Sequence, residues 1–397
     1  MTQAVADIAS GGIDLFLVAG EESGDQLGAA LMRALRVRTG GRVRFTGVGG
    51  REMTREGIAS LYPIDDLPII GFTAVPRRLP KILRLMRFTA RQVVASRPHA
   101  LVIIDSPGFT RGIARRVRAA DPTIPIVEYV SPQVWAWRPG RAKVMRAYID
   151  RILAILPFEP EVHQKLGGPA CTYVGHPLAA TIHHLRPDAE EARRRLASPP
   201  ILLMLPGSRM GEIKRLFAVF SDAVAKLRDR VGPLEVVIPT VPHLVDPIRR
   251  ASADWRVPPR IVAEPAEKAA AFRIARAALA KSGTVTLELA LSGVPMVTAY
   301  RVSTIEYLTV RRAIAKRLSS VILANIVLGE DVVPELLQRD CTADKLSDAL
   351  ASLLGETTER RRQLEAFARL DAIMEIGTSS PAARAADVVL ELLRVSH

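Results

Sequence analysis

The stretch 277–300 constrains the fold most, because its hydrophobic pattern changes twice within a short distance. An apolar run reaches Ala280, a polar loop interrupts it, a helical pattern follows, and β-prone residues resume after Pro295. We expect a strand, a helix and a strand, with Ser282 or Thr284 capping the helix and Gly293 at its end. Since such a crossover joins parallel strands, the stretch predicts a parallel sheet covered by helices.

This unit also predicts a ligand site. The helix would begin where a strand ends, which is where open α/β sheets bind ligands and where free N–H groups favour an anion. Glu288 lies one turn after Thr284 and could accept hydrogen bonds from vicinal sugar hydroxyls. The candidate ligand is therefore a nucleotide or a sugar phosphate, and the alternative is an ordinary βαβ unit with a surface glutamate.

Length and charge limit the classes of partner. A chain of 397 residues is long for one hydrophobic core, so two domains are expected. Lys plus Arg outnumber Asp plus Glu by 55 to 41, which favours nucleic acid, phosphorylated small molecules or an anionic membrane. Aromatic residues make up only 5%, and no basic run is interleaved with them, so we expect no nucleic-acid partner.

Cysteine and histidine usage predicts neither a disulfide framework nor a metal site. Cys171 and Cys341 are far apart, and His176, His183 and His184 lack partner cysteines or a metal-binding spacing. No stretch reaches the ~18 to 20 apolar residues that span a bilayer, and residues 1–12 do not resemble an export signal. We expect a cytosolic protein without a metal or cofactor, whose membrane contact is limited to its surface.

Acidic residues follow two predicted strands of the first half. The strand at 15–18 leads into a glycine-containing loop with Glu21 and Asp25, and the buried strand at 101–104 ends at Asp105. Carboxylates suit hydroxyl binding or base catalysis better than phosphate binding. For Asp25 we favour charge complementarity at the start of its own helix, and Asp105 is well placed for function.

A basic region separates these strands. No acidic residue occurs between Asp66 and Asp105, although seven Lys and Arg residues do. An apolar loop precedes a basic amphipathic helix, a pattern typical of interfacial membrane contact. The alternative is a helix packed on the core with a solvated basic face. The membrane or acceptor residues of this hypothesis are Ile69, Ile70, Phe72, Arg77, Arg78, Lys81 and Arg84.

The second half begins again with a strand at 201–205 and a loop containing Gly207, Ser208 and Arg209 before a helix. Glycine admits close backbone approach, and the arginine offers a planar fork, so this loop predicts a diphosphate cradle. It is not a P-loop, because no Gly-Lys-Ser/Thr follows. A further strand is expected at 321–327, with Asn325 inside it.

Strands alternate with helices in both halves, which predicts two doubly wound, Rossmann-like α/β domains facing across a cleft. The nucleotide would lie against the second domain and an acceptor against the first. We place the domains at 1–185 and 186–370. Residues 371–397 form a helical tail that returns to the first domain or packs on a partner subunit.

Several motifs resemble the lipid-A-disaccharide synthase family, in order from about residue 15 to 380. These are Ala19-Gly20-Glu21, Ser23-Gly24-Asp25, Gly47-Val48-Gly49-Gly50, Ser131-Pro132, Val134-Trp135-Ala136-Trp137, Leu156-Pro157-Phe158-Glu159, Tyr173-Val174-Gly175-His176-Pro177, Leu205-Pro206-Gly207-Ser208-Arg209, Ser282-Gly283-Thr284, Glu288 and Asn325.

The resemblance implies a GT-B glycosyltransferase without a cofactor. Its expected reaction joins UDP-2,3-diacylglucosamine to 2,3-diacylglucosamine 1-phosphate, releasing UDP and forming a β-1,6 disaccharide for lipid A of lipopolysaccharide. It also implies a peripheral position on the cytoplasmic face of the inner membrane and a C-terminal segment that reaches the first domain or a partner, as in a homodimer. The alternatives are another UDP-sugar GT-B enzyme, such as one with a different lipid acceptor or a 2-epimerase, and a membrane-surface protein that senses a nucleotide sugar.

By position, the resemblance places Gly207, Ser208 and Arg209 on the UDP diphosphate. It places Ser282, Gly283, Thr284 and Glu288 on the nucleotide phosphate and ribose, with Asn325 nearby. An α-linked donor that gives a β-linked product requires inversion, hence a base for the attacking hydroxyl and a cation such as Arg209 for the leaving group. Gly108 replaces the family's second acid after Asp105, so Glu21 and Asp105 both remain candidates for the base.

Overall fold

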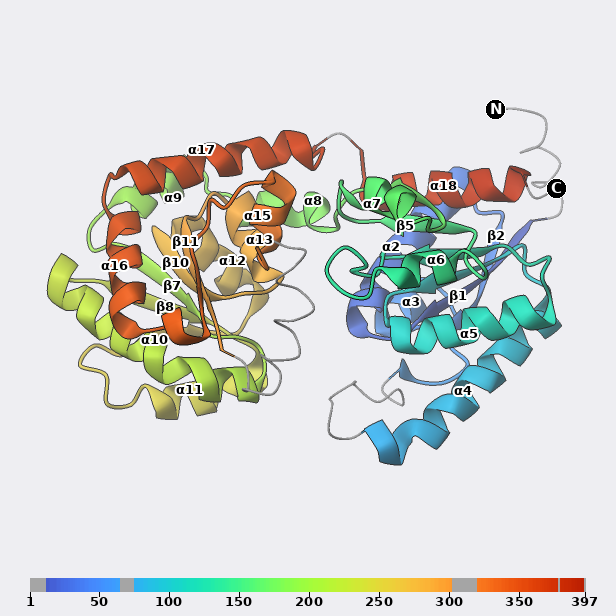
Figure 1. Ribbon diagram of the computed structural model, residues 1–397, viewed down its shortest axis with the longest axis horizontal. Coiled ribbons are helices and arrows are strands. Elements are labelled where there is room, and N and C mark those ends of the chain that lie inside the picture. The colour runs from blue at the N-terminus through green and yellow to red at the C-terminus, as the bar shows by residue number, and fades with distance from the viewer. Residues whose placement is uncertain (1–11, 65–74, 302–319, 378, 396–397) are drawn as a thin grey trace. The chain divides into compact units, whose positions relative to one another are not determined.

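The computed structural model describes residues 12–64, 75–301, 320–377 and 379–395, and within helix α4 the side chains at 75–78 are not described. The chain divides into two compact units, 1–179 with 377–397 and 180–376. Each unit contains one six-stranded sheet whose described strand pairs are all parallel (Figure 1). The expected α/β class with two doubly wound domains is confirmed.

Unit 1 has the strand order β2-β1-β3-β4-β5-β6. The order in which successive strands are added to the sheet reverses between β1 and β3, although all the strands are parallel. Its strands are β1 (Ile13–Ala19), β2 (Val43–Val48), β3 (Ala100–Ile104), β4 (Ile126–Tyr129), β5 (Arg151–Ala154) and β6 (Ala170–Tyr173). Its helices are α2 (Glu22–Thr39), α3 (Arg51–Arg55), α4 (Val75–Ser96), α5 (Pro107–Ala120), α6 (Gly140–Met145), α7 (Glu159–Lys165) and α18 (Pro381–Val395), with α8 (Leu178–Thr181) at the boundary of the units.

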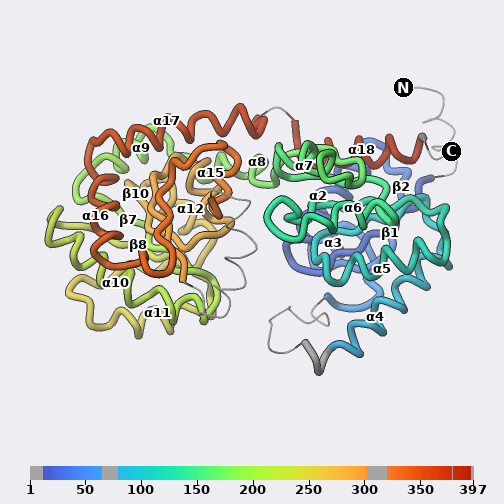
Figure 2. Tube along the Cα trace, in the orientation of Figure 1, coloured from blue at the N-terminus to red at the C-terminus, as the bar shows by residue number. Residues whose placement is uncertain are grey.

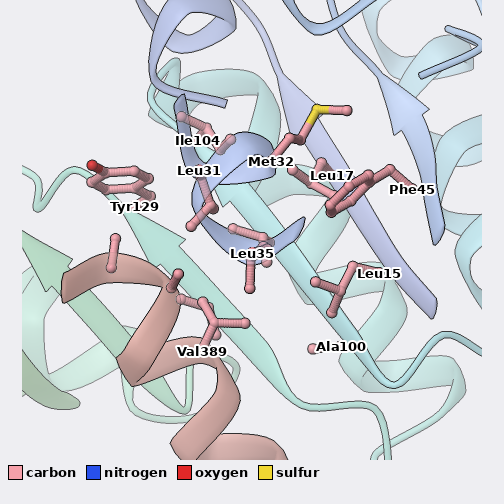
Figure 3. Packing of buried hydrophobic residues seen from close by; sticks show 14 of the residues in the cluster. Leu15, Leu17, Leu31, Met32, Leu35, Phe45, Ala100, Ile104, Tyr129 and Val389 are labelled. Atoms are coloured by element: carbon pink, nitrogen blue, oxygen red, sulfur yellow. The ribbon is translucent and has the colours of Figure 1, made fainter. Parts of the chain in front are cut away.

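Two hydrophobic clusters cover the faces of this sheet. One joins the strands to α2 and α18 and includes Leu15, Leu35 and Val389, as Figure 3 shows. The other joins the strands to α4 and α5 and includes Met86 and Ile113. Helices on both faces explain why the central strands are predominantly apolar.

The C-terminal helix α18 belongs to unit 1, and its place beside α2 can be followed in the trace of Figure 2. Its Val389 and Leu393 are buried in the cluster with α2. At the surface, Arg38 donates two hydrogen bonds to Asp387, at 2.6 and 2.9 Å. The buried side chains account for most of the docking free energy, because exposed ion pairs contribute little.

Unit 2 has the strand order β12-β11-β10-β7-β8-β9. The order in which successive strands are added reverses between β7 and β10, which are parallel neighbours. Its strands are β7 (Ile201–Leu205), β8 (Glu235–Pro239), β9 (Arg260–Val262), β10 (Ala277–Lys281), β11 (Met296–Tyr300) and β12 (Glu335–Leu337). Its helices are α9 (Ala189–Leu196), α10 (Met210–Val231), α11 (Val245–Ala251), α12 (Pro265–Ile274), α13 (Val285–Leu291), α15 (Leu323–Leu328), α16 (Ala343–Leu354) and α17 (Thr358–Ile373). Short 3₁₀ turns span Ile182–Leu185, Pro242–Leu244 and Gln338–Asp340.

The strand–helix–strand unit at 277–300 forms as β10, α13 and β11, with β10 and β11 parallel and paired. Gly293 follows the helix with a φ of +66°, the left-handed conformation that glycine favours, and its N–H donates to Ala290. The capping expectation is wrong. Thr284 occupies the N-cap position in a helical conformation without a side-chain cap, and the Ser282 hydroxyl does not cap the helix either.

The predicted strand at 321–327 is also wrong, since this segment contains helix α15. Asn325 lies within the helix with 2% of its surface exposed. Its side chain accepts from the N–H groups of Val332 and Val333 and donates to the Val333 carbonyl. The β-branched and apolar residues of this helix resemble a strand in sequence, but the helix ends at Gly329 and Asn325 fastens the turn before β12.

Candidate functional site

A cavity of about 520 Å³ lies in unit 2 at the carboxyl ends of β7 and β10. These strands are neighbours at the point where the strand order reverses, which is where open α/β sheets bind ligands. The loops after β7 and β10 and the first turns of α10 and α13 line it. Of the predicted nucleotide-binding residues, it brings together Gly207, Ser208, Arg209, Gly283, Thr284 and Glu288.

The loop after β7 is shaped by a carboxylate. Gly207 has a φ of +120°, and a Cβ there would lie 2.3 Å from Oε2 of Glu212. The same oxygen accepts from the N–H of Ser208 at 3.0 Å and of Arg209 at 3.3 Å. Only glycine tolerates this conformation and this approach, so Gly207 allows the amides at the start of α10 to converge on one anion.

Lys281, the last residue of β10, contributes an ammonium group to the same cavity. Its Nζ lies 3.1 Å from Oε1 of Glu212 and 5.2 Å from the ring centroid of Tyr300. Neither Glu212 nor Lys281 was among the site residues predicted from the sequence. The signals were available: Glu212 follows Arg209 at the spacing of a capping box, and Lys281 opens the Ser-Gly-Thr loop.

On the α13 side of the cavity, Glu288 is half-buried, and burial raises the pKa of its carboxyl while Lys268 opposes this shift. Both residues line the cavity. Two predicted residues do not. Ser282 is buried beside it with no hydrogen bond from its hydroxyl, and the side-chain amide of Asn325 is engaged in the turn before β12.

The corresponding edge of unit 1 carries a strained turn. Asp105 and Ser106, which follow β3, have φ values of +53° and +47°, a region that costs a non-glycine residue ~1 to 3 kcal/mol. The Asp105 carboxylate accepts from the Ser23 hydroxyl at 2.9 Å and from the N–H of Ser106 at 2.7 Å. A Cβ on Gly20 would lie 2.5 Å from Cβ of Ser106, so glycine lets the loops after β1 and β3 touch.

Glu21 is exposed and lies in the loop between β1 and α2. Strand β1 pairs directly with β3. The two candidate bases, Glu21 and Asp105, therefore follow adjacent strands at the reversal point of the unit 1 sheet. Strain of this kind is found at functional sites, where the surrounding structure holds it.

Asp25 has a different role from the one expected. Its side chain is 2% exposed and accepts from the N–H groups of Gly50, Glu52 and Met53, at 2.7, 2.8 and 3.0 Å. These donors belong to the first turn of α3. Asp25 thus satisfies the N-terminus of a neighbouring helix rather than the charge at its own.

A buried polar cluster supports the loop after β4. The Ser131 hydroxyl lies 2.9 Å from Nε2 of His163, and Glu159 accepts from the N–H of Leu156 and from Nε1 of Trp135, at 3.0 and 3.3 Å. Burial raises the pKa of Glu159 to about 7 and lowers that of His163 to about 4. The two motif segments around Trp135 and Glu159 are therefore joined by hydrogen bonds between their side chains.

Helix α4 is partly exposed. Leu79 and Phe88 are 45% and 42% exposed, and Lys81 and Arg84 are also exposed, whereas Met86 is buried against α5. One face of the helix thus packs on the core, while basic and apolar side chains of the opposite face remain at the surface. Of the other residues in the membrane hypothesis, Ile69, Ile70 and Phe72 lie outside the described residues, and Arg77 and Arg78 lie in α4 without described side chains.

Over the described part of the chain, no group of three or more His, Cys, Asp or Glu side chains is suited to hold a metal ion. Over the same ranges, no helix is both long and apolar enough to cross a membrane. Cys171 and Cys341 are free thiols in different units.

A model of the family described as lipid-A-disaccharide synthetase matches residues 15–388. The chain belongs to this family. Among its relatives, the lipid-A-disaccharide synthase of Bradyrhizobium diazoefficiens is 60% identical over 380 residues, which cover 96% of both chains.

Solved structures of other proteins share the architecture of this chain. The chain resembles a putative UDP-N-acetylglucosamine 2-epimerase from Listeria monocytogenes, with a TM-score of 0.61 at 12% identity over 96% of both chains. It resembles the glycotransferase of kitacinnamycin with a TM-score of 0.61 at 16% identity, over 96% of this chain and 99% of the other. At such identities the likeness shows the fold alone, the two-domain α/β fold of the GT-B class.

Proposed function

We propose that this member of the lipid-A-disaccharide synthetase family condenses UDP-2,3-diacylglucosamine with 2,3-diacylglucosamine 1-phosphate, giving the β-1,6 disaccharide 1-phosphate and UDP. The observation that carries the proposal is the unit 2 cavity, where backbone amides, Arg209 and Lys281 meet half-buried Glu288. Family membership supports the choice of these two sugars as substrates.

In this proposal unit 2 binds the donor. Gly207, Ser208 and Arg209 hold the diphosphate, because amides at a helix N-terminus and a guanidinium fork both favour phosphate oxygens. Glu288 accepts hydrogen bonds from the ribose hydroxyls. Gly283 and Thr284 line the cavity beside the phosphates.

The reaction is a direct displacement. As the 6-hydroxyl oxygen of the acceptor attacks C1 of the donor sugar, its proton passes to a carboxylate and the bond from C1 to the diphosphate oxygen breaks. UDP leaves with the bonding electrons, and Arg209 stabilises its added negative charge. We assign the base to Asp105, since two hydrogen bonds and a strained turn hold its carboxylate in one orientation.

We further propose that the protein associates peripherally with the cytoplasmic face of the inner membrane through α4. Exposed Leu79, Lys81, Arg84 and Phe88 combine apolar and cationic side chains on this helix. Such a surface suits an anionic bilayer, from which both acylated substrates would be taken. We also propose that the protein forms a homodimer, with helix α18 packed on unit 1 of its own chain.

Product analysis by mass spectrometry tests the reaction. The wild-type protein is expected to form the tetraacylated disaccharide 1-phosphate from the two diacylated substrates, and not from deacylated sugars. Turnover of deacylated UDP-sugars would instead support another UDP-sugar enzyme. Liposome binding without any disaccharide would support a sensor.

Site variants test the roles. Arg209→Ala is expected to abolish UDP release while the protein stays folded by circular dichroism, and near-normal turnover would remove Arg209 from the mechanism. Asp105→Asn is expected to lower turnover by about 10² to 10⁴ with UDP affinity unchanged, because a general base contributes this much. If Glu21→Gln shows that loss and Asp105→Asn does not, the base is Glu21.

A further inference from the structure

Glu212 and Lys281 form a pair inside the cavity that the reaction described above does not use. The Glu212 side chain is 7% exposed and the Lys281 side chain 19%. The carboxylate receives three donors: the N–H groups of Ser208 and Arg209, and the Lys281 ammonium. Two convergent amides and a cation form the donor set that binds a phosphate oxygen at the start of a helix.

Lys281 also lies between the two loops that line the cavity. Its Nζ is 3.1 Å from Glu212 of α10, and it would lie 3.3 Å from a Cβ on Gly283, next to the start of α13. The facing ring of Tyr300 favours a cation at this place. Any phosphate that contacts both loops therefore comes within reach of this ammonium group.

The charges in the cavity explain why the pair can exchange partners. Among the described residues that line it, Arg209, Lys268 and Lys281 are cationic, and Glu212 and Glu288 are anionic. Glu212 is an anion tethered to α10, with one negative charge, whereas a nucleoside diphosphate carries more negative charge into the same donors. The diphosphate thus competes with Glu212 for the amides and for Lys281.

We propose that Lys281 is a catalytic residue that binds the leaving diphosphate, and that Glu212 is a positioning residue that holds Lys281 and the amides until the diphosphate replaces it. This inference rests on the proposed function, since it assumes a UDP-sugar donor. Glu212 then preorganises the site and lowers its affinity for diphosphate at the same time. The simpler alternative is that Glu212 only caps α10, with Lys281 as its structural partner.

Calorimetric titration of the full-length protein with UDP and with uridine separates these alternatives. Lys281→Met is expected to weaken UDP binding about tenfold or more and to leave uridine binding unchanged, because only UDP carries the diphosphate. Glu212→Gln keeps an amide oxygen for the Ser208 and Arg209 N–H groups but removes the competing charge. This variant is expected to bind UDP several-fold more tightly.

Lys214→Met is the matched control, since Lys214 is an exposed lysine of the same helix that does not line the cavity. It should leave both affinities unchanged. The inference is overturned if Lys281→Met changes UDP affinity less than twofold, or if Glu212→Gln weakens it as much as Lys281→Met does. If the wild-type protein binds no UDP, the proposed function itself fails, which is a distinct result.

Discussion

At the scale of the residue, buried carboxylates organise this protein in three ways. Asp25 caps a neighbouring helix, Glu212 gathers the amides of the diphosphate loop, and Glu159 joins two loops of unit 1. Asp25 was predicted to complement the start of its own helix, but its partner is the start of α3, where Gly50 lies 25 residues further along the chain. Spacing alone does not reveal such tertiary pairs.

Glu159 predicts a pH dependence of stability. Its pKa in the folded protein is raised to about 7 by burial, so folding favours the protonated carboxyl. At low pH the Glu159 carboxyl is protonated in both the folded and the unfolded protein, so the folded state carries no penalty for burying it. Stability is then lost as the pH rises toward and through 7, because the unfolded protein releases this proton more readily. Glu159→Gln, which stays neutral, should gain about 2 kcal/mol of unfolding free energy relative to wild type between pH 5 and pH 8.

Urea denaturation at both pH values, followed by tryptophan fluorescence, checks this prediction. Trp135 and Trp137 report on unit 1, and Trp255→Phe removes the remaining tryptophan, which lies in unit 2. Any constant cost of the glutamine cancels when the two pH values are compared. If the unfolding free energy changed equally with pH in both proteins, ionisation of Glu159 would not destabilise the folded state, and the prediction would be wrong.

At the scale of the element, the central strands were predictable and the short edges were not. Strands β3 and β7 are continuous apolar runs, and β1 and β10 are apolar except for Asp14 and the terminal Lys281, as burial on both faces favours. The edge strands β6, β9 and β12 have only four, three and three residues and were missed. Helix α15 was taken for a strand because short apolar runs are ambiguous without their tertiary contacts.

Helix α3 supplies a prediction about capping. It has only five residues and begins at donors that Asp25 satisfies. Asp25→Ala leaves three N–H groups without this acceptor, and we expect a loss of about 2 to 3 kcal/mol in the unfolding free energy of unit 1. Asp14→Ala is the control, because the Asp14–Arg44 pair is exposed and should contribute less than ~1 kcal/mol. Similar losses for both would contradict the capping role.

At the scale of the whole molecule, the sequence predicted two α/β domains and a helical tail, and the motifs of unit 2 gather around one cavity. The sequence left open whether this tail returns to the first domain or packs on a partner subunit. Helix α18 completes the core of unit 1, although α17, which precedes it, belongs to unit 2. Helices α2 and α18, which are far apart in the sequence, pack together in the same hydrophobic cluster of unit 1.

The tail therefore links the stability of unit 1 to the C-terminus. Leu393→Ala should lower the unfolding free energy of unit 1 by about 2 to 5 kcal/mol, because it leaves a cavity against the cluster of α2 and β1. Glu391→Ala, at an exposed position of the same helix, should have little effect. The fluorescence of Trp255 should show an unchanged transition for unit 2, and a shift of that transition would contradict this assignment.

The anomeric configuration of the product distinguishes direct displacement from the other possible reactions. The wild-type protein is incubated with α-linked UDP-2,3-diacylglucosamine and 2,3-diacylglucosamine 1-phosphate, and the new linkage is determined by nuclear magnetic resonance. Direct displacement by a single base predicts a β-1,6 linkage, with one UDP released for each disaccharide. An α linkage, or UDP release without a new glycosidic bond, would contradict the account.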